Sequence, residues 1–156
     1  MTKASSAQAL IVASVLACLP SGASQAADKP IYLNSGKVLP TTLPFSEAVK
    51  VGNTYYLSGQ IGNIPGSLKL AEGGIKGESK QVMDNIKTTL EAHGLSMSDV
   101  VKCTVMLADM AEWNDFNEVY KTYFTAGNFP ARSAFGSSGL AFKARAEVEC
   151  IAVASK

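Results

Sequence analysis

The chain has 156 residues, of which 47% are hydrophobic, so it is long and apolar enough for one domain with a sizeable core. Its 14 basic and 13 acidic residues nearly cancel, and no run of lysines or arginines occurs, which argues against a protein that binds nucleic acid through its phosphates. One histidine and three cysteines without a CxxC pair are too few ligands for a zinc site at the usual spacing, so we expect no metal.

The first 26 residues have the pattern of a secretory signal peptide. An apolar core at residues 9–17 is followed by the small-x-small cleavage pattern of residues 24–26. The apolar core is too short to stay in a bilayer as a stable membrane span, which needs about 20 apolar residues. An alternative is a lipoprotein signal in which Cys18 is acylated. Either way, we expect residues 27–156 to form a periplasmic or secreted domain.

The next part of the chain is predicted to be rich in strands. Residues 29–35 form a short first strand, and two β-rich runs at 45–51 and 54–61 flank the turn Gly52-Asn53, which is typical of a hairpin. The loop at residues 62–77 contains several glycines but lacks the Lys-Ser/Thr ending of a phosphate-binding loop, so we expect a surface connection.

Two helices are predicted, each followed by a strand. Residues 78–93 carry apolar side chains at helical spacing, and His93 lies in the last turn, where it can interact with the helix dipole. After a strand at 100–107, Asp109 and Glu112 form a capping pattern for a second helix. The aromatic residues predicted for the buried face of that helix are Trp113, Phe116, Tyr120, Tyr123 and Phe124. Strands at 129–135 and 145–153 complete the chain.

The order β-β-β-α-β-α-β-β predicts an α+β fold in which a mixed sheet carries both helices on one face. The other face keeps apolar residues such as Ile151, so we expect it to pack against another copy of the chain. Cys103 and Cys150 fall at apolar strand positions as small core residues. Whether they pair is left open by the sequence.

A candidate site comes from the last two strands. Alternation in the final strand places Glu147 and Glu149 on the face of Ile151 and Val153, and Arg132 follows Pro130 in the strand before. A guanidinium matches a carboxylate, and a carboxyl in apolar surroundings has a raised pKa. Together they predict a small site for an anionic substrate with an acid or base beside it. The alternative is an Arg132–Glu147 ion pair that only ties two strands together.

The sequence resembles the RidA (reactive intermediate deaminase A) family of enamine/imine deaminases over residues 43–153. Each matching motif is weak alone, and their shared order carries the resemblance. The motifs lie at residues 57–61, 91–95, 99–105, 116–120, 129–133 and 146–152.

The resemblance implies a homotrimer of chorismate-mutase-like α+β subunits with ligand clefts between them. It implies hydrolysis, without a cofactor, of 2-aminoacrylate-type enamines and imines to 2-keto acids and ammonia. Arg132 would bind the carboxylate of the imino acid, and Glu147 would orient or activate the attacking water. The cleft would be lined by Ser58, Gly59 and Asn117.

Two pocket positions depart from the family pattern, since Phe45 and Ala134 stand where many deaminating members have a tyrosine and a cysteine. The lost hydroxyl leaves a second hypothesis, a binding module that holds small carboxylates or keto acids without turnover. A ribonuclease, the activity attributed to some relatives, is disfavoured by the neutral charge. The leader is a further departure, and an exported member would act on other imines, for instance those from amino-acid oxidation.

Overall fold

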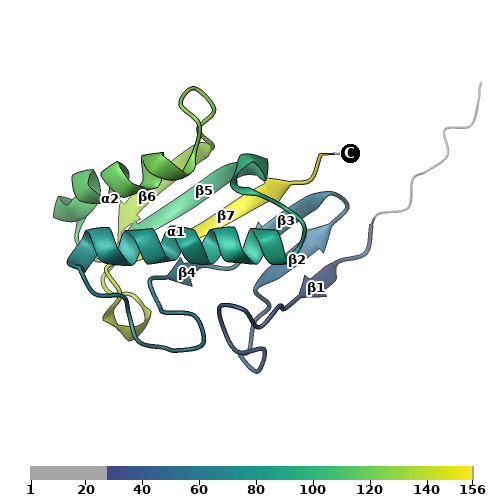
Figure 1. Ribbon diagram of the computed structural model, residues 1–156, viewed down its shortest axis with the longest axis horizontal. Coiled ribbons are helices and arrows are strands. Elements are labelled where there is room, and N and C mark those ends of the chain that lie inside the picture. The colour runs from purple at the N-terminus through teal and green to yellow at the C-terminus, as the bar shows by residue number, and fades with distance from the viewer. Residues whose placement is uncertain (1–27, 156) are drawn as a thin grey trace, which may run out of the picture.

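The computed structural model describes residues 28–155, so the predicted leader lies outside the described residues. The α+β prediction is confirmed: helices α1 (Gly74–Ala92) and α2 (Trp113–Tyr120) lie on the same face of one sheet (Figure 1). The strands are β1 (Ile31–Leu33), β2 (Ala48–Val51), β3 (Thr54–Leu57), β4 (Gln60–Ile61), β5 (Val100–Leu107), β6 (Ala131–Gly136) and β7 (Ala146–Val153).

The sheet is mixed, with the order β1-β2-β3-β7-β5-β6, and β4 pairs with β7 beside β3. Every pair is antiparallel except β5 and β6, which run parallel because α2 makes the crossover between them. The last strand of the chain therefore lies in the middle of the sheet, between β3 and β5 (Figure 1).

The core lies between the sheet and the helices. In α1, the predicted apolar stripe of Val82, Met83, Ile86 and Leu90 is at most 1% exposed. Burial of each such side chain contributes about 2 kcal/mol relative to exposure. In the strands, alternate residues face this core, so the side chains between them lie on the helix-free face.

The predicted strand at 54–61 is broken at Ser58 and Gly59. Its first part, β3, pairs with β2 and β7, and its second part, β4, pairs only with β7. At the break, the Ser58 hydroxyl donates to the Ser46 carbonyl at 2.7 Å, and the Ser58 N–H donates to the Glu47 carbonyl at 3.0 Å. These bonds replace ladder bonds that a continuous strand would make.

Helix α1 starts earlier than predicted, at Gly74, because Gly73 and Gly74 adopt positive φ angles of 101° and 62° and turn the chain into the helix. At the other end, His93 has a side-chain partner in addition to the predicted contact with the helix dipole. Its Nε2 lies 2.7 Å from Oε1 of Glu47, which is 5% exposed and also accepts a hydrogen bond from Ser35. This pair ties the end of α1 to the segment that leads into β2.

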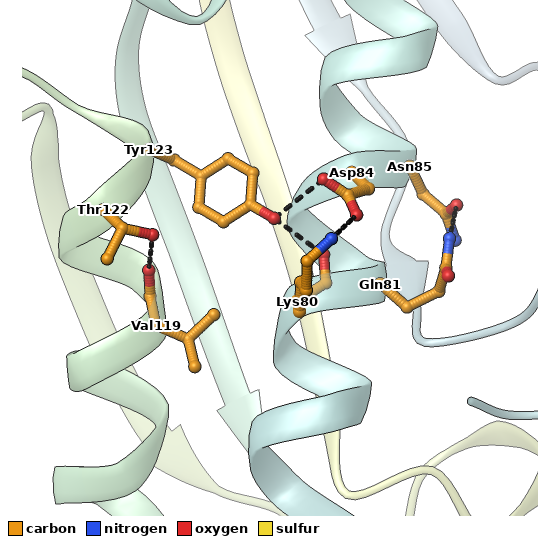
Figure 2. A network of polar contacts seen from close by, with 7 residues as sticks. All are labelled: Lys80, Gln81, Asp84, Asn85, Val119, Thr122 and Tyr123. Atoms are coloured by element: carbon orange, nitrogen blue, oxygen red, sulfur yellow. Dashed lines mark hydrogen bonds and ion pairs between the residues drawn. The ribbon is translucent and has the colours of Figure 1, made fainter. Parts of the chain in front are cut away.

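Helix α2 is fixed at both ends. Asp109 accepts a hydrogen bond from the Ala111 N–H, as the capping pattern predicted, whereas Glu112 forms an ion pair with Arg145 instead of completing the cap. Beyond the other end, the Tyr123 hydroxyl donates to Asp84 of α1 at 2.8 Å (Figure 2). Burial and this hydrogen bond raise the pKa of Tyr123. The contact holds α2 against α1.

The open question about the cysteines is answered by a disulfide between Cys103 and Cys150, which face each other directly in the β5–β7 pair. Among residues 28–155 no helix is long and apolar enough to cross a bilayer. The same part of the chain contains no group of three side chains that could hold a metal ion.

Candidate active site

Glu147 lies on the helix-free face of β7, aligned with Ile61 of β4 and Met106 of β5. Its carboxylate lines a cavity of about 230 Å³. The position of β7 is fixed just before this residue, because the Arg145 N–H donates to the buried carboxylate of Glu78 in α1 at 2.8 Å. The other cavity-lining residues are Leu39, Leu43, Phe45, Gly59, Ile61, Leu68, Ala141 and Phe142.

Gly59 is a glycine because Glu147 occupies the space of its side chain. A Cβ on Gly59 would lie 2.1 Å from Glu147 Oε1 and 3.0 Å from its Cδ. The break between β3 and β4 therefore lets the carboxylate lie directly against the backbone. A predicted cleft residue and a predicted catalytic residue are thus in contact.

The surroundings of Glu147 favour its neutral form. Burial raises the pKa of the Glu147 carboxyl, and the negative charge of Glu149 raises it further. Within residues 28–155, neither carboxylate oxygen of Glu147 has a hydrogen bond or ion-pair partner. A carboxyl with a raised pKa and free oxygens in a cavity is typical of a general acid or base.

Of the other residues predicted near Glu147, Phe45 lines the cavity and is 47% exposed. Ser58 is next to Gly59 in the chain but does not line this cavity. Its hydroxyl proton is used in the bond to Ser46, so the remaining capacity of this oxygen is to accept.

Arg132 lies on the opposite face, under α2. It is aligned with the buried Cys103, and its Cζ lies 4.6 Å from the ring centre of Trp113 and 4.5 Å from that of Tyr120. The two rings hold the guanidinium by cation–π contacts, each contributing about 0.5–2 kcal/mol. Arg132 lines a second cavity, which has a volume of about 360 Å³, and Asn117 also lines it.

The charge of Arg132 is not neutralised by a carboxylate anywhere in the described chain. Burial raises the pKa of Tyr120 to about 12, although the Arg132 charge lowers it in part, so the phenol stays neutral beside the guanidinium. The donors of Arg132 are therefore available to an anion. Ala134 is two residues further on the same face and packs against the core, outside the Arg132 cavity.

One protomer does not bring all the predicted site residues together. Phe45, Gly59 and Glu147 share one cavity, and Asn117 and Arg132 share another on the other side of the sheet. The alternative of an Arg132–Glu147 ion pair within one chain is wrong, because their strands point them to opposite faces. A ligand that touches both must lie between two copies.

Sequence reasoning missed two parts of this arrangement. Trp113 and Tyr120 were assigned to the core alone, although their helical spacing also lets both rings contact one strand residue. The apolar wall around Glu147 was missed because Leu39, Leu68 and Phe142 come from three separate connecting segments, which are too short for a periodic pattern.

Comparison with known proteins places this chain in a family. A family model described as "Endoribonuclease L-PSP" matches residues 36–154. The chain is 46% identical over 110 residues to the mouse protein named 2-iminobutanoate/2-iminopropanoate deaminase, covering 70% of this chain and 81% of the mouse protein. The human protein of the same name is also 46% identical over 110 residues, with 70% of this chain and 80% of that protein covered.

A solved structure of similar fold is the RidA protein from an Antarctic Psychrobacter species. It has a TM-score of 0.74 and 37% identity, and the match covers 80% of this chain and 99% of that one. The shared fold and the level of identity agree with the family match. The chain therefore belongs to the RidA/endoribonuclease L-PSP family.

Proposed function

We propose that this protein hydrolyses 2-imino acids to 2-keto acids and ammonia, at sites shared by neighbouring subunits. The observation that carries the proposal is that two cavities hold complementary groups. The Arg132 guanidinium, which no carboxylate of the described chain neutralises, lines one cavity, and the Glu147 carboxyl, which has no partner there, lines the other. The deaminase names of the mouse and human relatives support the same reaction.

Arg132 binds the substrate carboxylate. Its planar fork can form two parallel hydrogen bonds with a carboxylate, which fixes the orientation of the substrate as well as its position. The rings of Trp113 and Tyr120 already contact the guanidinium, so little side-chain entropy is lost when substrate binds. Asn117, in the same cavity, is placed to contact the substrate beside the carboxylate.

Glu147 assists the addition of water to the imine carbon. The carboxylate removes a proton from water as the oxygen attacks, and the C=N double bond becomes a single bond to an amine. That proton passes to nitrogen, and the C–N bond breaks to release ammonia. As the C=O bond of the keto acid forms, the hydroxyl proton of the adduct returns to Glu147 and then passes to ammonia. The balance is R–C(=NH₂⁺)–COO⁻ + H₂O → R–CO–COO⁻ + NH₄⁺. A general base of this kind typically adds ~10²–10⁴-fold.

A homotrimer completes the sites. A cyclic assembly repeats one contact, so that the Arg132 cavity of each subunit lies beside the Glu147 cavity of the next. Exposed aromatic side chains on the helix-free face, Tyr56 and Phe135, support burial of that face against another copy. The number of three follows the family resemblance, and sedimentation or light scattering of the purified protein tests it.

The protein works outside the cytoplasm, after removal of residues 1–26 or after acylation of Cys18. The Cys103–Cys150 disulfide supports this location, because disulfides persist in oxidising compartments and are rare in the cytosol. The substrates there are imines from the oxidation of amino acids. Fractionation of the cells and the N-terminal sequence of the purified protein decide between cleavage and lipidation.

A binding module without turnover is the second candidate. Phe45 favours it because a phenylalanine has no hydroxyl to contact the water or the substrate. Ser58 favours it because its hydroxyl proton is used in the hydrogen bond to the Ser46 carbonyl. An RNA-cleaving enzyme, which the family description evokes, would need a basic groove that the net charge of +1 does not provide. Salt-dependent RNA binding by the purified protein would reverse that judgement.

The deciding assay supplies imines from an amino-acid oxidase and measures keto-acid formation above the spontaneous rate. Arg132→Ala should lower kcat/KM by about 10²-fold, from the loss of a charged bidentate contact. Glu147→Gln should lower kcat, whereas Glu149→Gln, a matched control outside the cavity on the same strand face, should stay active. Stabilisation by a keto acid without any turnover would identify the binding module instead.

A further inference from the structure

The cavity around Glu147 has one charged end and an apolar body. Among residues 28–155, Glu147 is the only ionisable residue that lines it, and an oxygen of its carboxylate lies against Gly59. The other walls are hydrocarbon. They come from Leu39, Leu43 and Phe45 between β1 and β2, Leu68 before α1, and Ala141 and Phe142 between β6 and β7.

Several of these walls are exposed although they are large and apolar. Phe142 is 58% exposed, and Phe45 and Leu68 are each 47% exposed. Exposed apolar side chains that converge on one hollow mark a binding site rather than an ordinary surface.

Phe142 is held in this wall at a conformational cost. It has a φ of 56°, and the next residue, Lys143, has a φ of 61°. Non-glycine residues avoid this left-handed region, because the Cβ atom lies too close to the carbonyl oxygen there. A bulky aromatic residue in such a conformation, at the edge of a cavity, is typical of a side chain whose placement serves a ligand.

We propose that this hollow is the side-chain subsite of the enzyme and that it selects 2-imino acids with large apolar side chains, such as the imine of leucine. The inference rests on the proposed function. With the imine carbon beside Glu147, the substituent on that carbon extends along the apolar walls. A volume of about 230 Å³ has room for several water molecules, so a single methyl or ethyl group would leave much of it unfilled.

A second copy of the chain is the competing occupant. An apolar side chain inserted by a neighbouring subunit would cover the Glu147 carboxylate and leave it without a hydrogen-bond partner. Burial of an unpaired carboxylate is strongly unfavourable. A substrate avoids this cost, because its imine nitrogen and the attacking water bring donors to the carboxylate while its side chain fills the apolar end.

The test compares two imines made by the same route. An L-amino-acid oxidase with catalase produces one imine from leucine and another from 2-aminobutyrate, and keto-acid formation above the spontaneous rate is measured for the protein purified after expression of the full chain. We expect kcat/KM for the leucine imine to be at least about 10-fold higher, from the two additional buried carbons. Equal values, or a preference for the smaller imine, would overturn the subsite.

Two variants sharpen the test. Ala141→Leu narrows the hollow and should reduce the ratio of the two kcat/KM values, and Phe142→Ala should reduce it by removing one wall. Tyr32→Ala is the control, because Tyr32 is 70% exposed on β1 and lines none of these cavities. A ratio that stays unchanged in both wall variants would contradict the proposal.

A binding measurement separates the subsite from the reaction. Calorimetry with 4-methyl-2-oxopentanoate and with pyruvate needs no turnover. Tighter binding of the branched keto acid, together with no hydrolysis of either imine, would overturn the deaminase function and keep the subsite. Equal binding would overturn the subsite alone. If neither keto acid binds and Ala141→Leu dissociates the assembly, the hollow belongs to a subunit contact and the proposal is wrong.

Discussion

Arg132 and Glu147 lie on opposite faces of the same sheet, separated in the strand order only by β5. Arg132 is aligned with Cys103 under α2, and Glu147 is aligned with Met106 on the face that no helix covers. The two side chains therefore cannot act on one small molecule within a protomer. Each subunit therefore has two separate parts of a site, the Arg132 cavity and the Glu147 cavity.

This separation predicts complementation between two inactive variants. Arg132→Ala and Glu147→Gln proteins, each inactive alone, should regain activity when their subunits are mixed by refolding. In a cyclic trimer that contains both variants, about one site in three has both wild-type groups. Random mixing makes about three quarters of the trimers mixed, so about a quarter of wild-type activity should return. The double variant, treated in the same way, is the control. Continued inactivity in assemblies shown by mass spectrometry to be mixed would mean that the two residues serve no common site.

Gly59→Ala should strongly reduce activity without unfolding the protein. The new Cβ would lie 2.1 Å from Glu147 Oε1, so the flexible carboxylate must move out of its place. We expect kcat to fall by ~10²-fold or more, as for loss of a general base. Gly139→Ala is the matched control, because a Cβ there meets nothing within 4 Å. Activity and Tm are measured for both, and an active Gly59→Ala protein would argue against the placement of the carboxylate.

Glu149→Gln should move the acid limb of the pH–rate profile to lower pH. Glu147 must be deprotonated to accept a proton, so activity should rise as pH rises through its raised pKa. The Glu149 charge contributes to that elevation, and removing it lowers the pKa of Glu147. Measurement of kcat/KM against pH in both proteins checks the shift. A limb that moves upward, or a rate that is constant across the acid range, would exclude Glu147 as the base.

Trp113→Leu should weaken substrate binding more than it slows the reaction. Leucine keeps apolar contact with the core but removes the ring that lies 4.6 Å from the Arg132 guanidinium. Loss of one cation–π contact should raise KM by about 2- to 5-fold with little change in kcat. The same substitution in an Arg132→Ala background should have no further effect on KM. An additive effect there would show that Trp113 acts through packing alone.

Reduction of the disulfide should destabilise the domain substantially. Cys103 and Cys150 are 47 residues apart, and the chain-entropy relation gives about 4 kcal/mol for a loop of this length. Urea unfolding with and without a reductant, monitored by tryptophan fluorescence, measures the difference. Cys103→Ala/Cys150→Ala, which lacks the cross-link, should unfold at the same urea concentration under both conditions.

The parts of this structure that the sequence predicted are those with a local pattern. Alternation in the final strand placed Glu147 and Ile151 together on one face, and helical spacing identified the buried stripe of α1. The break at Gly59 could not be predicted locally, because its cause is a carboxylate from the far end of the chain. The early start of α1 was missed because Gly73 and Gly74 oppose helix formation by propensity.

The site was predicted as a set of residues and not as a geometry. Alternation shows which side chains of one strand share a face of the sheet. It does not show which side chains of a neighbouring strand lie on that same face, because this depends on the pairing register. The opposition of Arg132 and Glu147 depends on the registers of β5 with both flanking strands. The partner of His93 was likewise invisible, because Glu47 comes from a loop distant in sequence.

The cross-link between Cys103 and Cys150 has a consequence for chemical resistance. With both sulfur atoms bonded and Ala134 in place of a pocket cysteine, residues 28–155 offer no thiolate to alkylating agents or peroxides. Electrophiles such as quinones or maleimides, which inactivate enzymes through an accessible sulfhydryl group, find no free thiol in residues 28–155. If the proposed substrates come from oxidases, the enzyme works beside hydrogen peroxide, and residues 28–155 contain no free cysteine for that oxidant to attack.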